Sequence, residues 1–366
     1  MKGRRPRPLD DGDSGEIRVS GHLCWAKPIK NRWVFNTVRS AIITHMSIIS
    51  ISTKASIREA AESLRSGNLV AFPTETVYGL GADATNEDAV SRIYEVKGRP
   101  IGHPLIVHIP SIELLDIWTS DVPEYAIKLA RRFWPGPMTL VLPRSPFAKD
   151  FITGGQDNIG VRVPAHKVAL KLLEEFKVLG GSGVAAPSAN RFGKLSPTSA
   201  LDVDNELGNQ MSKNDKILDG GESFIGLEST IIDCTKSRPT VLRPGAITTN
   251  MINTLNMNNP KMSLSNILDQ SIKAPGLLKS HYSPKATVIL DFTPQEGHGL
   301  IAYKHILTPP GVVRLASPTS NEEYARLLYR ALRTADLLHI TNVSVFTPQG
   351  DDIAVAINDR LKRICH

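Results

Sequence analysis

Basic side chains stand close together in residues 97–108, KGRPIGHPLIVH, where a predicted helix ends. Lys97 and Arg99 occupy that end, where cations are favourable on their own account because a helix C-terminus carries partial negative charge. Two cations held between prolines would also bind an anion, since Arg binds phosphate or carboxylate through paired hydrogen bonds and Lys serves as a point charge. The segment therefore indicates either a charged helix end or an anion site.

A further arginine lies inside a predicted strand in residues 158–166, NIGVRVPAH. Arg162 stands between Val161 and Val163, whose side chains face the opposite side of that strand. An arginine in this setting is often a surface residue. If it points into a pocket, it is suited to bind an α-carboxylate.

Four other segments place hydroxyl, amide or basic groups next to strand ends: FPTETVYGLG (72–81), APSANRFGKLSP (186–197), GLESTIID (226–233) and VLRPGAI (241–247). In the first, two glycines let the backbone approach a ligand closely, although a plain strand-to-turn connection explains it equally well. No segment is specific alone. Together they favour an anionic ligand with a small zwitterion, and catalysis by positioning and charge stabilisation.

Familiar catalytic and nucleotide-binding motifs are absent from the sequence. There is no P-loop and no HExxH, and residues 79–84 and 180–184 fail the dinucleotide and nucleophile-elbow patterns. The three cysteines are scattered without a CxxC pair, which argues against a disulfide scaffold and a structural zinc site. We therefore expect no resident metal site.

The net charge of +7 is concentrated near the N-terminus. Residues 1–45 carry +5 and the other 321 residues only +2, which gives little support to bulk nucleic-acid binding. The longest apolar stretch, about residues 41–51, is interrupted by polar residues and is shorter than the roughly 20 residues of a membrane span. We expect a cytoplasmic protein without a membrane partner.

Regular structure is predicted to begin near residue 52, with Ser56 and Glu59 as a capping box before an amphipathic helix. Strands and helices then alternate to about residue 247, which predicts an α/β or α+β domain over 52–247. Residues 1–51 lack a periodic pattern and are interpreted as a dispensable extension, with Met46 as a hypothetical start. Residues 248–285 read as a linker, and residues 286–366 as a smaller α/β domain.

The order of these segments resembles the YrdC-like domain of threonylcarbamoyl-AMP synthases. PTETVYGLG, KGRP with PLIVH, WPGPMTLVL, GVRVPAH, APSANRFGKLSPT, GLESTIID and VLRPGAI follow one another within residues 52–247, and SHYSP (280–284) resembles the linker of the two-domain form. The resemblance implies an α/β fold with a twisted mixed sheet and flanking helices. A smaller Rossmann-like α/β domain would follow the long linker.

The resemblance also implies a reaction. L-threonine, bicarbonate or CO2, and ATP would give threonylcarbamoyl-AMP and pyrophosphate. The threonine amine would form a carbamate, and a carbamate oxygen would attack the α-phosphate. Mg2+ would enter with the ATP phosphates. A downstream tRNA threonylcarbamoyl transferase would receive the product for threonylcarbamoyladenosine formation, so tRNA would be met only indirectly.

Residue roles follow from the resemblance, motif by motif. Lys97 and Arg99 would be the catalytic residues that stabilise charge on the phosphate. L-threonine would be bound by Thr76, His108, Arg162, Ala186 and Ser229. ATP would be bound by Arg99, His103, Asn158, Ser188, Asn190, Ser196, Arg243 and Tyr282. His103 stands where the family more usually has Asn. Tyr282 would either bring the linker over the nucleotide as a lid or pack on the domain surface.

Two other functions are compatible with the same fold. One is a module that binds double-stranded RNA or tRNA, which the near-neutral body of the chain disfavours because phosphate contacts dominate nucleic-acid affinity. The other is a different carbamoyl or adenylyl transferase. No acylphosphatase or zinc-finger-like cysteine pattern accompanies the domain, so we rank this function last.

Overall fold

The structure is a computed structural model that describes residues 49–255, 272, 274–276 and 282–365. All of these described residues belong to a single compact unit. The hypothetical start at Met46 lies outside the described residues, as do Ser280 and His281 of the SHYSP motif and most of the expected linker.

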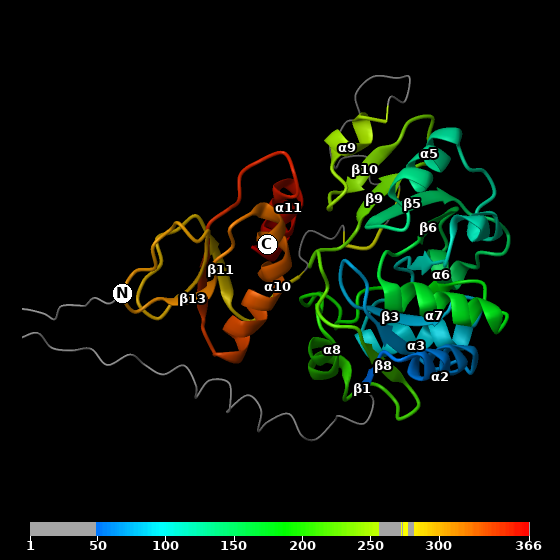
Figure 1. Cartoon of the computed structure of the whole chain (residues 1–366), viewed down its shortest axis with the longest axis horizontal. Helices are drawn as coiled ribbons and strands as arrows, with labels where there is room; N and C mark the ends of the chain where they lie inside the picture. The colour runs from blue at the N-terminus through cyan, green and yellow to red at the C-terminus, as the bar shows by residue number, and fades with distance from the viewer. Residues whose placement is uncertain (1–48, 256–271, 273, 277–281, 366) are drawn as a thin grey trace, which may run out of the picture. The chain divides into compact units, whose positions relative to one another are not determined.

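A mixed 10-stranded sheet is the scaffold of the larger part of the molecule (Figure 1). In spatial order its strands are β1 (Ile49–Ile51), β8 (Lys216–Asp219), β2 (Val70–Phe72), β3 (Gly79–Asp83), β7 (Val184–Ala185), β4 (Ile106–His108), β6 (Asn158–Arg162), β5 (Met138–Pro143), β9 (Thr230–Asp233) and β10 (Thr240–Arg243). Parallel and antiparallel pairs alternate irregularly along it. The predicted mixed sheet with flanking helices is confirmed.

Helices cover this sheet on both faces because its strands are apolar on both sides. Along β2, Val70 and Phe72 pack with α2 and α7, whereas Leu69 and Ala71 belong to the core on the other side. This alternation is the two-residue period of a strand. The helices are α2 (Lys54–Arg65), α3 (Glu87–Lys97), α4 (Leu115–Trp118), α5 (Glu124–Phe133), α6 (Asp150–Thr153), α7 (Lys167–Val178), α8 (Ala200–Leu207) and α9 (Thr249–Asn253), with a 3-10 turn at Ile112–Leu114.

The N-cap of helix α2 lies three residues before the predicted one. The N-cap is Thr53, whose hydroxyl accepts a hydrogen bond from the Ser56 amide, while the Ser56 hydroxyl accepts one from the Thr53 amide. Ser56 is therefore the third residue of the helix and not its N-cap, and Glu59 takes no part in the capping box. The prediction was wrong here because Thr and Ser both cap well, and sequence spacing alone does not choose between them.

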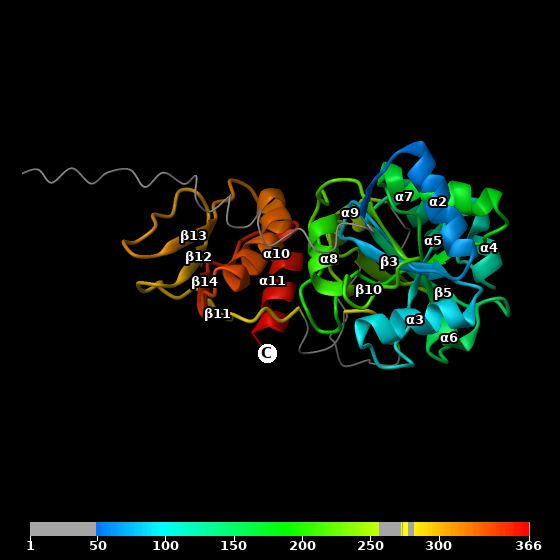
Figure 2. The ribbon, with the colours of Figure 1, turned by 90° about the horizontal axis from the view of Figure 1, so that it is seen from below.

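A second sheet of four parallel strands lies C-terminal to the first. Its order is β11 (Thr287–Leu290), β14 (Asn342–Val345), β12 (Gly299–Ile301) and β13 (Val313–Ala316). Helices α10 (Asn321–Leu337) and α11 (Ala354–Ile364) cover one face of it, as Figure 2 shows. The predicted cap at Ser320 is confirmed, since its hydroxyl accepts from the Glu323 amide.

Strand pairing brings the predicted polar residues together. His108 on β4 is directly opposite Arg162 on the parallel strand β6, so their side chains share one face of the sheet. A bridge between Gly79 and Ser188 joins the start of β3 to the loop after β7. Arg243 pairs opposite Ile231, close to Ser229, at the edge of the same sheet. Residues far apart in sequence thus meet because of strand order.

Candidate active site

A narrow pocket lies where these strand ends meet. It is lined by Thr74, Thr76, Val77, Tyr78, Gly79, Arg99, Ile106, His108, Arg162, Ala186, Pro187, Ser188, Glu228, Ser229, Arg243, Pro275, Gly276 and Tyr282. All residues expected to bind L-threonine are among these lining residues. Of those expected to bind ATP, Arg99, Ser188, Arg243 and Tyr282 line the pocket. All six segments singled out in the sequence therefore contribute to one pocket, together with Pro275, Gly276 and Tyr282.

Arg162 is the central buried cation of the pocket, with 4% of its surface exposed. Its Nη2 lies 2.6 Å from a carboxylate oxygen of Glu75, its Nη1 donates to the Thr76 hydroxyl at 3.0 Å, and its Nε donates to the Gly136 carbonyl at 3.2 Å. An Arg has five N–H groups, so two remain for a ligand. Glu75 fixes the guanidinium plane and balances its charge.

Sequence reasoning missed Glu75, although it stands between the two threonines of the PTETVYGLG motif. Its second carboxylate oxygen accepts a hydrogen bond from the Ala165 amide at 3.0 Å. Glu75 therefore ties the turn after β2 to the segment after β6. An acid at that position is the signal that the pocket arginine has a fixed partner.

His108 is held neutral in this pocket. Burial, with the adjacent charge of Arg162, lowers the pKa of His108 to about 3. Its ring stands edge-on to Phe72 with the centroids 6.0 Å apart, and its Nδ1 has no hydrogen-bond partner. A neutral imidazole can accept or donate one hydrogen bond to a ligand without adding charge.

His108 should make the fold sensitive to acid. Because its folded pKa of about 3 lies below the unfolded value of 6.5, its contribution to stability is complete above pH 6.5 and is lost as the pH falls toward 3. H108Q is expected to reduce the slope of the unfolding free energy against pH by about 1.4 kcal/mol per pH unit between pH 6.5 and 4. Urea titrations at several pH values measure this. H305Q, at an exposed histidine, is the control, and an equal slope in both variants contradicts the assignment.

Arg99 and Arg243 supply further positive charge. Burial lowers the pKa of Arg99 to about 10, so it stays charged at neutral pH, and its Nη2 donates to the Pro104 carbonyl at 3.0 Å. Arg243 donates to the Ser229 carbonyl through Nε and Nη2, at 3.1 and 2.9 Å, and to the Pro275 carbonyl through Nη1 at 2.8 Å. The pocket is thus built to receive an anion.

Lys97 is buried, but its ammonium group does not line the pocket. It donates to the carbonyl oxygens of Ser188, at 2.6 Å, and Asn190. Burial and the nearby charge of Arg99 hold the pKa of Lys97 well below its usual value. The structure therefore makes Lys97 an anchor for the loop that carries Ser188 into the pocket.

Two other residues expected at the nucleotide also bind protein groups. The Asn190 amide donates to the carbonyls of Arg191 and Lys194, at 2.7 and 2.8 Å, which closes its loop. The Ser196 hydroxyl donates to a carboxylate oxygen of Glu228 at 2.5 Å. Both side chains therefore hold segments next to the pocket in place and do not line it themselves.

His103 and Asn158 lie farther out. The His103 ring stands edge-on to Phe192 with the centroids 5.5 Å apart. Asn158 lines a smaller neighbouring cavity together with Pro275. Neither belongs to the residues that line the main pocket in this conformation.

The pocket as it stands is too small for a nucleotide. Its free volume is about 60 Å³, room for a few water molecules. Pro275 and Gly276 fill the side next to Arg243, and a Cβ built on Gly276 would lie 2.4 Å from the Tyr282 hydroxyl. Entry of a larger ligand therefore requires these residues to move away from Arg243.

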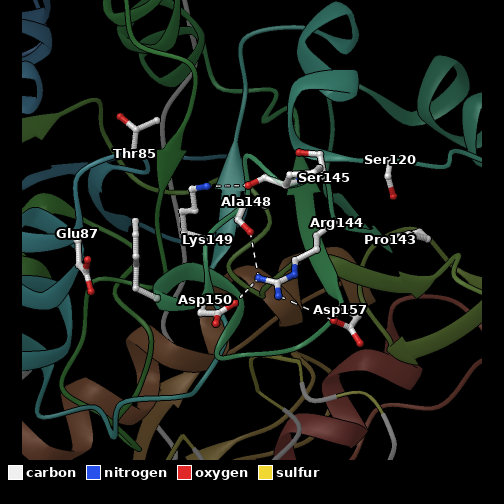
Figure 3. Close-up of a pocket in the computed structure, with 12 residues that line it drawn as sticks. Thr85, Glu87, Ser120, Pro143, Arg144, Ser145, Ala148, Lys149, Asp150 and Asp157 are labelled. Carbon is white, nitrogen blue, oxygen red and sulfur yellow. Dashed lines mark hydrogen bonds and ion pairs between the residues drawn. The ribbon is translucent and has the colours of Figure 1, made fainter.

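A wider groove of about 920 Å³ lies elsewhere on the larger part of the molecule (Figure 3). Its central Arg144 is paired with Asp150 at 2.5 Å and lies 3.9 Å from Asp157, and Lys149 donates to the Pro146 carbonyl. Its lining carries three carboxylates and two cations, so it is not a basic site, and none of the predicted site residues lines it. The narrow pocket is therefore the candidate site.

Comparisons with known proteins agree with this geometry. A family model described as "Telomere recombination" matches residues 62–245, and the model "Threonylcarbamoyl-AMP synthase, C-terminal domain" matches residues 247–364. The threonylcarbamoyl-AMP synthase of Pyrococcus abyssi is 43% identical over 328 residues, which cover 84% of this chain and 93% of the relative. The chain belongs to the threonylcarbamoyl-AMP synthase family. It is therefore an enzyme of the nucleotidyltransferase type.

Other threonylcarbamoyl-AMP synthases extend the comparison. That of Schizosaccharomyces pombe is 34% identical over 319 residues, which cover 76% of each chain. The crystal structure of P. abyssi Sua5 complexed with L-threonine is similar to this chain, with a TM-score of 0.77 and 39% identity. It covers 87% of this chain and 97% of that one, so the likeness includes both sheets.

The helices of this threonylcarbamoyl-AMP synthase family member give no sign of a membrane span. Within residues 49–255 and 282–365, no helix is both long enough and apolar enough to cross a bilayer.

Proposed function

We propose that the chain makes threonylcarbamoyl-AMP, pyrophosphate and water from L-threonine, bicarbonate and ATP. The observation that carries the proposal is the convergence of Arg162, Arg99 and Arg243 on one pocket between strand ends. The carboxylate of a zwitterion and the phosphates of ATP are both bound by cations. The family relative crystallised with L-threonine supports this amino acid as a substrate.

The threonine side of the pocket would be built on Arg162. The two free N–H groups of its guanidinium are suited to the α-carboxylate, since paired N–H donors match that geometry. Thr76 and Ser229 are buried hydroxyls in the same wall, and His108 is a neutral donor or acceptor. These residues would orient the amine for attack on the carbon of bicarbonate or CO2.

The nucleotide side would be built on Arg99, Arg243 and Ser188. In the second step a carbamate oxygen attacks the α-phosphorus, the bond to the β-phosphate oxygen breaks, and pyrophosphate leaves. Charge accumulates on the phosphoryl oxygens, where fixed guanidinium groups stabilise it best in a site without water. No protein nucleophile is needed.

Mg2+ would arrive with ATP. Among the described residues no group of three or more His, Cys, Asp or Glu side chains is placed to hold a metal ion. Glu228, the carboxylate among the lining residues, already accepts hydrogen bonds from Ser196 and Arg360. Magnesium commonly binds through substrate phosphates and water, and that mode suits this pocket. The product would pass, in the cytoplasm, to a tRNA threonylcarbamoyl transferase.

Pyrophosphate release tests the proposal. The full chain, with ATP, Mg2+ and bicarbonate, is expected to release pyrophosphate only when L-threonine is added, and L-serine serves as the control amino acid. Omission of bicarbonate should stop the release as completely as omission of threonine. Folded protein that releases none, or that responds equally to other amino acids, contradicts the proposal and directs attention to RNA binding or another transfer reaction.

A further inference from the structure

A buried cation of the C-terminal helix α11 contacts the wall of the pocket. Arg360 has no exposed surface. Its Nε donates to a carboxylate oxygen of Glu228 at 2.8 Å, its Nη2 to the Pro244 carbonyl at 3.1 Å, and its Nη1 to Asp359 at 2.6 Å. Each nitrogen of the guanidinium thus has a partner, and two of the three partners belong to the catalytic sheet and its loops.

Glu228 is the carboxylate that this cation holds. It lines the pocket and accepts further hydrogen bonds from Ser196 at 2.5 Å and from the Tyr329 hydroxyl at 3.2 Å. Burial alone would raise the pKa of Glu228, but the charges of Arg360 and Arg243 hold it down to about 2. Its position is therefore fixed by Ser196 from the larger part of the molecule and by Tyr329 and Arg360 from helices α10 and α11.

Tyr282 is the second pocket residue next to Arg360. The guanidinium carbon lies 5.5 Å from the centre of the Tyr282 ring, within the range of a cation–π contact. The ring also stacks on Tyr329 of α10, with the centroids 5.7 Å apart. The backbone of Tyr282 has a φ of +66°, an uncommon conformation for a residue other than Gly, and persists only where the surroundings impose it.

We infer that Arg360 is a positioning residue for the nucleotide side of the pocket: Glu228 and Pro244 hold its guanidinium in place, and it acts through the ring of Tyr282. It does not line the pocket, but it touches two residues that do. The C-terminal part of the chain would thus complete the site. This inference rests on the proposed function, since it assumes that Tyr282 contacts the bound nucleotide.

A purely structural role is the alternative. A buried Arg–Glu pair often adds little net stability, yet removal of one partner leaves an uncompensated charge. The two roles differ in what they predict for ligands. A structural pair lowers stability without selectivity, whereas a positioning residue changes nucleotide binding more than threonine binding.

The test compares R360K and R360M in the full chain by calorimetric titration with ATP and, separately, with L-threonine. R360K keeps a positive charge beside Glu228 but loses the planar group that spans Glu228, Pro244 and the ring of Tyr282. Both variants are expected to bind ATP at least about tenfold more weakly, with threonine affinity changed less than about threefold. R330M is the matched control. Like the Arg360–Glu228 pair, the Arg330–Glu222 pair joins a C-terminal helix to the larger part of the molecule, but its side chains are about half exposed.

A double-mutant cycle with Y282L separates the two roles. If Arg360 acts through Tyr282, the loss of ATP affinity in R360M/Y282L equals that of Y282L alone, and R360K retains more affinity than R360M. Losses that multiply, or folded R360K that binds ATP like the wild type, overturn the inference. R360K in place of R360M completes the cycle if the methionine variant does not fold.

The wild-type chain distinguishes this failure from failure of the proposed function. Wild type that binds ATP but releases no pyrophosphate with threonine contradicts the proposed reaction, while the Arg360 comparison stays readable. Wild type with threonine-dependent release and unchanged Arg360 variants contradicts the inference alone. A chain that binds no ATP contradicts both.

Discussion

R162L/E75Q is expected to lose threonine binding while it keeps its fold. Arg162 has two buried N–H groups left for an α-carboxylate, and loss of such a charge-assisted pair lowers affinity by about a hundredfold or more. The single change R162L would leave Glu75 as an unpaired buried charge and destabilise the fold. The double change removes both charges together, so it isolates the effect on the ligand.

Threonine titration, with circular dichroism to show that the fold persists, measures this expectation. R162K adds a second comparison, since it keeps the charge but not the paired donors. ATP affinity should change little in all these variants. A folded R162L/E75Q chain that binds threonine normally would remove Arg162 from the threonine site.

K97M is expected to reduce turnover by about a hundredfold, the size of effect that a misplaced pocket group causes when a residue behind it is lost. Its ammonium group bonds the carbonyls of Ser188 and Asn190. Without it these carbonyls lose their partner, and the loop that presents Ser188 to the pocket loses its fixed position. Threonine affinity should be unaffected, because Arg162 and His108 lie on other strands.

K194M is the matched control for this prediction. Lys194 is an exposed lysine that follows the same loop, so the same substitution there tests loss of charge without loss of the anchor. Single-turnover measurements should show slow chemistry in K97M and normal chemistry in K194M. Wild-type turnover in folded K97M would exclude Lys97 from the mechanism.

Much of the fold and the pocket could be predicted because local patterns carry the information. Arg162 between two valines, and turn residues directly after apolar runs, mark strand ends that strand pairing then brings together. The pairing of His108 with Arg162 follows from two short parallel strands. The family resemblance supplied the roles, which remain proposals.

Sequence reasoning missed the contacts between residues that lie far apart in the chain. Lys97 was expected to face phosphate because its charge is visible in the sequence, whereas the two carbonyls that it binds are about ninety residues away. Glu75 and Glu228 are ordinary acids until the fold places Arg162 and Arg360 beside them. Arg360, 132 positions from Glu228, shows no pattern in the sequence that points to the pocket.

Strand β1 has a consequence for where this chain can be shortened. Its residues pair in parallel with β8, and the Ser52 hydroxyl donates to the Asp219 carbonyl, so regular structure starts before the expected boundary at residue 52. A polypeptide trimmed to begin at residue 52 would present β8 as an open sheet edge, with unpaired amides free to recruit a strand from another molecule. One beginning at Met46 would keep β8 paired and leave the three-residue strand β1 as the edge, and very short edge strands are one means by which proteins limit such pairing.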